Sequence, residues 1–413
     1  MKKMKLNLII PTLIIITFIS RIIALFLFGD TSLENEWKVL VHNLSEKGVL
    51  GYYIVNSEFL ATPGLAGTND IVLPSVFMPP LYAYFIYLIK YIFSGFINFV
   101  NVIIIIQILV SVTATYIFFK ILRISETRIV SFYSALTFSI IPINVYATVQ
   151  ISSISIQIFL LIYFFYILKI FSEEKKISQK NLLIFSILSG LLILLRGEFL
   201  LFYFFTIIYF FLFYIRNIKL FIISLIITLM VISPYILRNY YNFNTFTITK
   251  SIGYNLLKGN NPDFKIEGNP SFINEKFSRE NLSIKTDKDY EIKLDNLYKD
   301  KAIEYIKSDP VFYLKNYFIK VLSFLTFDPY SSYEKYFSIS HFAPKLVLSI
   351  LSVLGGVLAI KKKGYLQFLS IYFFLNIFFF SIFFILPRYS IILLPVQILL
   401  SLEFIKLFIK KIR

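Results

Sequence analysis

The stretch KKISQKNLLIFSILSGLLILLRGEFLLFYFFTIIYFFLFYIRNIK, residues 175–219, decides the fold of this chain. It contains two apolar runs, 181–195 and 199–215, each close to the length that crosses a bilayer as a helix. Lys and Arg lie at both ends of the stretch, and a short turn with Arg196 and Glu198 separates the two runs. Because cytoplasmic loops of membrane proteins collect Lys and Arg, the pattern predicts a hairpin of membrane helices whose turn faces the outer side.

The composition of the whole chain leads to the same class of protein. Of its 413 residues, 57% are hydrophobic and 19% aromatic, whereas soluble domains rarely exceed half apolar residues. We therefore predict an all-α polytopic membrane protein with about ten transmembrane helices. The expected spans are residues 6–28, 98–122, 129–147, 151–171, 181–195, 199–215, 218–237, 345–360, 365–386 and 390–409.

The charge and the rarer residue types narrow the possible functions. The net charge of +17 comes largely from Lys and Arg in the expected cytoplasmic loops, so it indicates membrane topology and not nucleic-acid binding. The chain has no Cys, and its only histidines are His42 and His341, which excludes thiolate chemistry and disfavours a His-based metal site. We predict no cofactor and no bound metal.

Five basic connections determine the expected topology. Counting ten spans from a cytoplasmic N-terminus places all five on the cytoplasmic side, together with the C-terminus. The connections are KILRISETR (120–128), FSEEKKISQK (171–180), YIRNIK (214–219), IKKKG (360–364) and the tail IKKIR (409–413).

Two further apolar runs, 77–93 and 311–327, test this count. A crossing by 77–93 alone would reverse every later loop, so we expect both runs to lie along the outer face as interfacial or re-entrant helices. Residues 1–30 lack the short apolar core and the cleavage site of a signal peptide, so 6–28 is expected to remain as the first span. The prediction is an inner (plasma) membrane protein with cytoplasmic termini and a site on the periplasmic or outer face.

Two long regions are expected on the outer side. They divide the chain into a transmembrane module (1–237) that contains the first outer region (29–98), a second outer region (238–344) and C-terminal spans (345–413). In the first region, residues 33–48 have apolar residues at helical spacing beside Trp37, which predicts a short amphipathic helix resting on the membrane. In the second, a charged stretch predicts a helix closed by Pro310.

Three arginines, Arg196, Arg238 and Arg388, lie on the outer side of the expected topology. A charge at membrane depth costs free energy, and Arg binds phosphate oxygens through two N–H groups. Each of them alone could merely reach lipid headgroups or cap a helix end. Together, with Glu198 close to Arg196, they predict a site for a phosphate-bearing lipid at the outer surface.

Three acids follow the first expected span in GDTSLENEW: Asp30, Glu34 and Glu36. A carboxylate beside a phosphate leaving group can act as a general base toward an acceptor hydroxyl or amine. The same residues would also be favoured simply as N-cap or first-turn acids of a helix. The sequence leaves open which of the three is the base.

The segment SPYILRNYYNFNTFTITKSIGYNLLKGNNP, residues 233–262, resembles part of the polyprenyl-phosphate-dependent glycosyltransferases of the GT-C class. In that class a span ends in Pro-aromatic-x-x-Arg-Asn-Tyr, and a Gly-x-Asn-Leu-x-x-Gly-Asn-Asn-Pro run follows. The matching residues are Pro234, Tyr235, Arg238, Asn239, Tyr240, Gly253, Asn255, Leu256, Gly259, Asn260, Asn261 and Pro262.

Other elements resemble the same class in order and spacing. MPPLYAY (78–84), LLRGE (194–198) and PRYSIILLP (387–395) are similar to its Pro-Pro-Leu element, its Leu-Leu-Arg-Pro-Glu element and its last hairpin. The nearest groups are the protein O-mannosyltransferases and the lipid A aminoarabinose transferases. Two departures are that Gly197 replaces the usual Pro and that Glu34 occupies the place of the usual Asp relative to Trp37.

The resemblance implies an inverting transfer of a sugar from a polyprenyl-phosphate donor to a lipid, polysaccharide or protein acceptor. Arg196, Arg238 and Arg388 would bind the lipid phosphate, and one of the three acids would deprotonate the acceptor. Gly253 and Gly259 would let backbone amides approach the substrate, although a Gly/Asn turn cluster would explain them equally well. The implied substrate contacts are Glu198, Asn239, Asn255, Lys258, Asn260 and Asn261.

A transporter or lipid flippase for a phosphate-bearing lipid or glycan is the alternative function. It would also place Arg and Glu in outward cavities of a helical bundle. Transporters often carry internal repeats with paired broken helices, and no such symmetry relates the two halves of this sequence. The sequence therefore favours the transferase.

Overall fold

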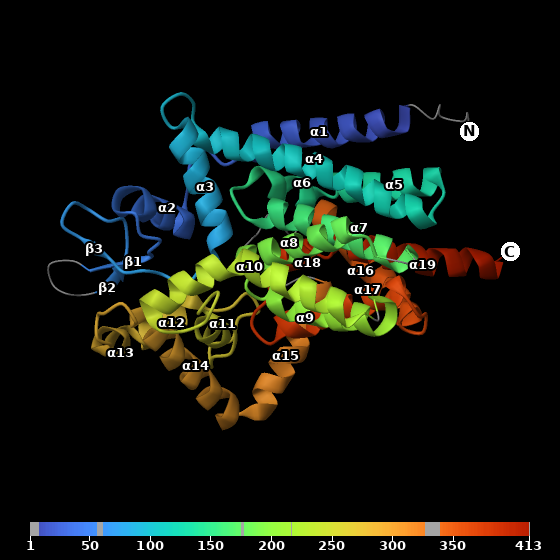
Figure 1. Cartoon of the computed structure of the whole chain (residues 1–413). Helices are drawn as coiled ribbons and strands as arrows, with labels where there is room; N and C mark the ends of the chain where they lie inside the picture. The colour runs from blue at the N-terminus through green and yellow to red at the C-terminus, as the bar shows by residue number, and fades with distance from the viewer. Residues whose placement is uncertain (1–7, 56–60, 175–176, 216, 327–338, 413) are drawn as a thin grey trace.

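The computed structural model describes residues 8–55, 61–174, 177–215, 217–326 and 339–412. A helical bundle occupies one part of the molecule and a smaller assembly of short helices and strands covers one end of it (Figure 1). The bundle consists of α1 (Ile9–Phe28), α4 (Phe99–Ser125), α5 (Arg128–Ile140), α6 (Pro142–Val149), α7 (Ile154–Glu173), α8 (Gln179–Leu195), α9 (Phe199–Phe210) with the π-helical turn η2 (Phe211–Ile215), α10 (Ile218–Phe243), α16 (Ile339–Ile360), α17 (Tyr365–Ser381), α18 (Pro387–Ile391) and α19 (Leu394–Ile412). The remaining elements are α2 (Asn35–Lys47), β1 (Tyr53–Val55), β2 (Ala61–Pro63), β3 (Ile71–Val72), α3 (Pro80–Phe93), α11 (Ile252–Gly259), α12 (Pro270–Lys276), α13 (Ser278–Ser283), α14 (Tyr290–Ser308) and α15 (Pro310–Leu325).

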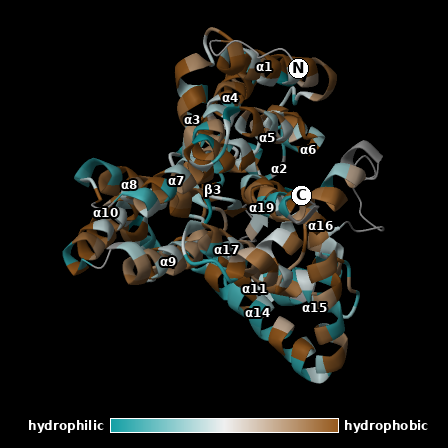
Figure 2. Ribbon diagram, turned by 90° about the vertical axis from the view of Figure 1, so that its right-hand side faces the viewer, coloured by the Kyte–Doolittle hydropathy of each residue, from teal (hydrophilic) through white to brown (hydrophobic). Residues whose placement is uncertain are grey.

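The bundle is built from apolar helices that expose hydrophobic side chains on the outside. By length and composition, five described helices could cross a membrane: α1, α4, α7, α10 and the part Phe342–Ile360 of α16. α8, α9 and α17 are apolar but shorter. Phe26 on α1 is 85% exposed, and Figure 2 shows hydrophobic residues over α1 but hydrophilic residues along α14. This surface requires lipid around the bundle, so the chain is an integral membrane protein, while the number of ten spans stays a prediction.

The third expected span, 129–147, is divided into two helices. It breaks between α5 and α6, which meet at a 54° bend. Pro142 begins α6; it has no N–H to donate, and its ring disfavours helical backbone at the preceding residue. The side-chain amide of Asn144 donates to the freed Phe138 carbonyl at 2.9 Å. Arg21, buried in α1, donates to the Ser139 carbonyl, so this intramembrane arginine closes the break.

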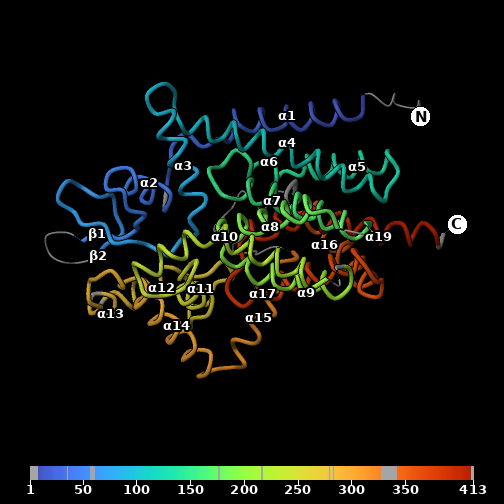
Figure 3. The backbone as a smooth tube through the Cα atoms, viewed as in Figure 1, coloured from blue at the N-terminus to red at the C-terminus, as the bar shows by residue number. Residues whose placement is uncertain are grey.

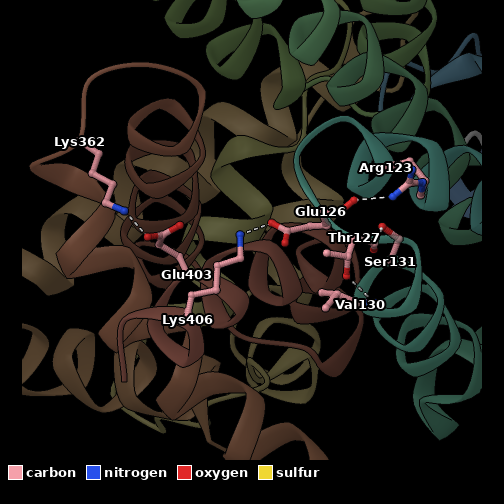
Figure 4. Close-up of polar contacts among 8 residues, drawn as sticks. All are labelled: Arg123, Glu126, Thr127, Val130, Ser131, Lys362, Glu403 and Lys406. Carbon is pink, nitrogen blue, oxygen red and sulfur yellow. Dashed lines mark hydrogen bonds and ion pairs between the residues drawn. The ribbon is translucent and has the colours of Figure 1, made fainter. Parts of the chain in front are cut away.

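Ion pairs join several basic connections at one end of the bundle. Lys362, between α16 and α17, pairs with Glu403 of α19, and Lys406 of α19 pairs with Glu126 at the end of α4 (Figure 4). The start of α1 and the end of α19 lie at this same end, opposite the short helices and strands (Figure 1). Three of the five connections expected to be cytoplasmic therefore lie together, although the side of the membrane that they face stays a prediction.

The two ambiguous apolar runs form α3 and α15. α3 has 14 residues and α15 has 16, which give lengths of about 21 and about 24 Å, shorter than a hydrocarbon core of about 30 Å. α3 runs across the axis of the bundle in both views (Figures 1 and 2). In Figure 3, α14 leads away from the bundle and α15 returns to it. These lengths and directions agree with the expectation that neither run crosses the bilayer.

The outer assembly has a core of its own. β1 pairs with β2 and with β3 in a small antiparallel sheet that the sequence analysis did not anticipate. The expected amphipathic helix is α2, and the expected helix before Pro310 is α14. Leu257 of α11 packs in a second buried cluster with aromatic residues of α12 and α14. This cluster lies at the end of the bundle opposite the described start of α1 and end of α19 (Figure 1).

Candidate active site

Arg196 lies where α8 ends, in the turn that leads into α9. It is the C-cap of α8, and its Nε atom donates to the Gln157 side-chain oxygen on α7 at 3.3 Å. The turn packs closely against the segment after α10, because a Cβ atom on Gly197 would lie 2.6 Å from the Thr249 hydroxyl. Burial lowers the pKa of Arg196, Glu198 opposes this shift and Arg388 adds to it. Arg196 is thus a partly buried cation between an acid and a second arginine.

Lys258 and Arg388 complete a group of three cations that we call the cation cluster: Arg196, Lys258 and Arg388. Lys258 lies on α11, and its ammonium lies 4.3 Å from the centre of the Phe384 ring. Burial lowers the pKa of Lys258, Arg388 lowers it further, and Glu36 and Glu267 raise it. The charge of Arg388 acts on both of the other cations, so Arg388 lies within electrostatic range of Arg196 and of Lys258. They come from segments far apart in the sequence.

A small and mostly apolar cavity is lined in part by Arg196. Its volume is about 10 Å³, which is enough for roughly one water molecule. A phosphate group is larger than this space, so this cavity is not a phosphate site. The cavity is lined by Gln157, Leu161, Arg196, Glu198, Phe199, Phe202, Tyr372, Asn376, Phe380 and Ile392.

The three candidate acids lie in the region 29–98, and the charge of one of them, Glu36, acts on the cation cluster. Asp30 accepts a hydrogen bond from the Ile151 backbone N–H at 2.7 Å, just before α7. Burial raises the pKa of Asp30, the Ile151 hydrogen bond partly offsets this, and the charge of Glu34 adds to it. Glu34 is exposed at the N-cap of α2 and accepts from the Ser32 hydroxyl at 2.6 Å. Glu36 is the first-turn acid of α2 and the one whose charge acts on Lys258.

Arg238 and Asn239 do not join the cation cluster through any described contact. Arg238 donates to the Ser75 carbonyl at 2.7 Å and the Leu50 carbonyl at 3.0 Å, both in the first outer region. Asn239 is fully buried, and its amide donates to the Thr247 carbonyl at 2.6 Å. Arg238 thus joins the end of α10 to the loop around the small sheet. Phosphate binding by Arg238 stays a prediction that these contacts do not favour.

The asparagines of the GNN segment are engaged by the protein's own carbonyls. The Asn260 amide donates to Leu256 and, at 2.8 Å, to Ile382, and the Asn261 amide donates to Leu257 and Lys258. Asn255 is half-buried and has a long contact of 3.5 Å to the Ser251 hydroxyl. Their expected contacts with a sugar stay predictions, and the described bonds give Asn260 and Asn261 the role of closing a turn.

The two glycines of the motif also serve packing within the protein. A Cβ atom would lie 1.8 Å from the Asp295 carbonyl at Gly253 and 1.9 Å from the Phe383 carbonyl at Gly259. α11 therefore approaches the backbone of α14 and of the loop after α17 more closely than any residue with a side chain could. The close approach that the sequence suggested exists, but its partner is the chain itself.

Sequence reasoning missed three polar residues around the site. Gln157 holds Arg196, and its polar side chain in the apolar run 151–171 was the available signal. Lys320 is a lysine inside the apolar run 311–327 and is fully buried. Glu291, in α14, is buried against residues 75–77. It stands among other charged residues in the sequence, so no signal there indicates that it is buried. Among the described residues, no group of three or more His, Cys, Asp or Glu side chains could hold a metal ion.

This architecture is the fold of the GT-C class of membrane glycosyltransferases, as the sequence resemblance predicted. Over 97% of the chain, the structure is similar to the archaeal oligosaccharyltransferase AglB from Archaeoglobus fulgidus in complex with an inhibitory peptide and a dolichol-phosphate, with a TM-score of 0.54 and 13% identity. A second structure of that enzyme, in complex with zinc and sulfate, gives the same TM-score of 0.54 at 11% identity. The chain spans about half of the archaeal enzyme's length, 50% and 49% in the two comparisons.

A more distant likeness is to ArnT from Cupriavidus metallidurans bound to undecaprenyl phosphate. It has a TM-score of 0.44 and 9% identity over 95% of this chain and 77% of ArnT. No protein-family model and no curated protein matches the chain. At such low identities the likeness to AglB establishes the fold, and the activity has to be argued from the site.

Proposed function

We propose that this protein is a membrane glycosyltransferase that takes a sugar from a polyprenyl-phosphate donor and passes it to an acceptor at the outer face. The observation that carries the proposal is the cation cluster: Arg388 of α18 lies within electrostatic range of Arg196, at the end of α8, and of Lys258 on α11, beside an apolar bundle. A lipid chain can lie against such a bundle while its phosphate reaches the cations. The AglB structure, which contains a dolichol-phosphate, supports a lipid phosphate as the ligand class.

The cations would stabilise the phosphate as it leaves. The bond between the anomeric carbon and the phosphate oxygen breaks, and the phosphate departs with the electron pair. Arg196, Lys258 and Arg388 bind the negative charge that develops, which lowers the barrier because they are already in place. Gln157 fixes the orientation of Arg196, and the Phe384 ring lies against the Lys258 ammonium.

Asp30 is the general base in this proposal. A base works best when its pKa lies nearer the operating pH than that of a free carboxylate, and burial and the charge of Glu34 raise the pKa of Asp30. Asp30 also lies near the substrate site. It accepts a hydrogen bond from the Ile151 N–H just before α7, and Arg196 donates to Gln157 in the first turn of the same helix. Asp30 takes the proton of the acceptor hydroxyl or amine, which attacks the anomeric carbon from the side opposite the phosphate, with inversion. Glu36 faces Lys258 and would orient it.

The first experiment measures lipid binding to the purified protein in detergent. Native mass spectrometry compares undecaprenyl phosphate with undecaprenol, which lacks the charge, for wild type and for Arg196→Met, Lys258→Met and Arg388→Met. A charged hydrogen bond contributes about 1.5–3 kcal/mol, so each variant should bind undecaprenyl phosphate roughly 10- to 100-fold more weakly and undecaprenol equally well. Lys315→Met, on an exposed residue of α15, is the control that should change neither.

Equal binding of the two lipids by the wild type, or unchanged binding by all three variants, would refute the lipid-phosphate site. The second measurement is sugar release from a polyprenyl-phosphate donor by wild type, Asp30→Asn, Glu34→Gln and Glu36→Gln. Asp30→Asn alone should abolish turnover while keeping phosphate binding. Translocation of the lipid without any turnover would instead establish the flippase.

A further inference from the structure

Lys320 is a buried lysine that the proposed reaction does not use. It lies in the apolar helix α15, and its side chain is 0% exposed. Its ammonium donates to the Phe383 carbonyl at 2.7 Å, the Asn260 side-chain oxygen at 3.0 Å, the Gly259 carbonyl at 3.3 Å and the Ile382 carbonyl at 3.4 Å. One side chain therefore binds two separate segments of the chain, the end of α11 and the loop after α17.

The burial of this ammonium has an energetic cost that its surroundings must offset. In the described part of the chain, no Asp or Glu forms an ion pair with Lys320. Burial lowers its pKa to about 7. A buried charge without a counter-ion is rare and usually has a reason beyond stability, since an apolar side chain of the same size would fill the space at lower cost.

The two segments that Lys320 joins both carry members of the cation cluster. Lys258 directly precedes Gly259, and Arg388 follows Phe383 by a few residues. The segments also bind each other: the Asn260 amide donates to the Ile382 carbonyl at 2.8 Å, and the Ile385 N–H donates to the Ile266 carbonyl at 2.9 Å. Lys320 binds this junction from a third element, α15, so it fixes how α11 and the late loop lie against each other.

We propose that Lys320 is a positioning residue of the lipid-phosphate site, which holds the Gly259 and Phe383 carbonyls so that Lys258 and Arg388 face the same phosphate group. The proposal rests on the proposed function. Lys320 itself is fully buried, so it acts through the two exposed or half-buried cations and not by contact with the lipid. The ligand chemistry that it supports is a phosphate monoester or diester on a long isoprenoid chain.

The test compares Lys320→Met, which keeps the length and removes the charge, with Lys315→Met on the exposed side of the same helix. Affinities for undecaprenyl phosphate and undecaprenol are measured in detergent, together with the midpoint of thermal unfolding. We expect Lys320→Met to bind undecaprenyl phosphate about 10-fold more weakly, with undecaprenol binding unchanged, and Lys315→Met to behave as wild type. Asn260→Ala, which removes one oxygen that Lys320 binds, should show a smaller loss of the same kind and covers the case in which Lys320→Met does not fold.

A double-mutant cycle separates positioning from a general structural role. If Lys320 acts through Lys258, the losses from Lys320→Met and Lys258→Met should not add, and the double variant should bind little worse than Lys258→Met alone. A folded Lys320→Met protein with wild-type affinity, equal losses for both lipids, or fully additive losses would overturn the proposal. A wild type that does not distinguish undecaprenyl phosphate from undecaprenol would overturn the proposed function and this inference together.

Discussion

The replacement of Glu291 by Gln should change how the stability of the protein depends on pH. Glu291 is buried in α14, and its carboxylate accepts a hydrogen bond from the Val76 N–H at 2.8 Å. Its other oxygen has no partner among the described residues. Burial raises the pKa of Glu291 from 4.5 to about 7, and hydrogen bonds from residues 75–77 and the charge of Arg238 partly oppose this. The native state therefore retains a proton that the unfolded chain releases at lower pH.

The size and sign of the effect follow from this difference in pKa. Between pH 4.5 and about pH 7 the native state binds more protons than the unfolded state, so the free energy of unfolding falls as the pH rises. A rise of the pKa from 4.5 to about 7 corresponds to about 3.5 kcal/mol, since a tenfold change in a proton-binding constant is worth about 1.4 kcal/mol. The stabilising contribution of Glu291 is fully present below its unfolded pKa and is lost as the pH rises through its native pKa. Gln at this position accepts the same hydrogen bond and does not titrate.

Thermal unfolding of the purified protein in detergent at pH 5 and pH 8 tests this reasoning. We expect the midpoint of wild type to fall by several degrees more than that of Glu291→Gln between these two pH values. Asp300→Asn, an exposed acid on the same helix, is the control and should follow wild type. If wild type and Glu291→Gln have the same pH dependence, Glu291 is not buried as an isolated acid between the two outer regions, and the argument fails.

Three further predictions concern contacts with backbone carbonyls. Arg238→Met leaves the Ser75 and Leu50 carbonyls without their donor, so it should speed proteolysis of the first loop. The variant should still prefer undecaprenyl phosphate to undecaprenol. Loss of this preference would instead place Arg238 at the phosphate. Gly259→Ala forces a Cβ atom to within 1.9 Å of the Phe383 carbonyl and should weaken undecaprenyl phosphate binding about tenfold or more, whereas Gly95→Ala, with nothing within 4 Å, should not. Arg21→Leu should lower the unfolding temperature and leave lipid preference intact, because Arg21 binds the Ser139 carbonyl at the break between α5 and α6; a selective loss of phosphate binding would contradict that role.

Local properties of the sequence determined the helical bundle. Apolar runs and the distribution of Lys and Arg predicted its helices and placed the basic connections on one side, because hydropathy and charge act on each segment almost independently of the rest. In the structure, three of these connections lie at one end. Pro142 is the visible signal for the break within the expected span 129–147, because proline has no N–H to continue the helix. The helix before Pro310 was predicted from a charged stretch and from the helix stop at that proline.

Only the tertiary structure decided which polar residues share a site. Arg196, Arg238 and Arg388 are equivalent in hydropathy and in expected side, yet the structure brings Arg388 into range of Arg196 and of Lys258 and turns Arg238 toward the Ser75 carbonyl. The burial of Lys320 likewise depends on α15 packing against two segments that lie about 60 residues away on either side in the chain. Which groups meet is set by the packing of distant segments, and whether a charge is buried depends on surfaces that no single segment contains. For this reason the sequence by itself could predict the bundle, whereas which polar residues come together required the folded chain.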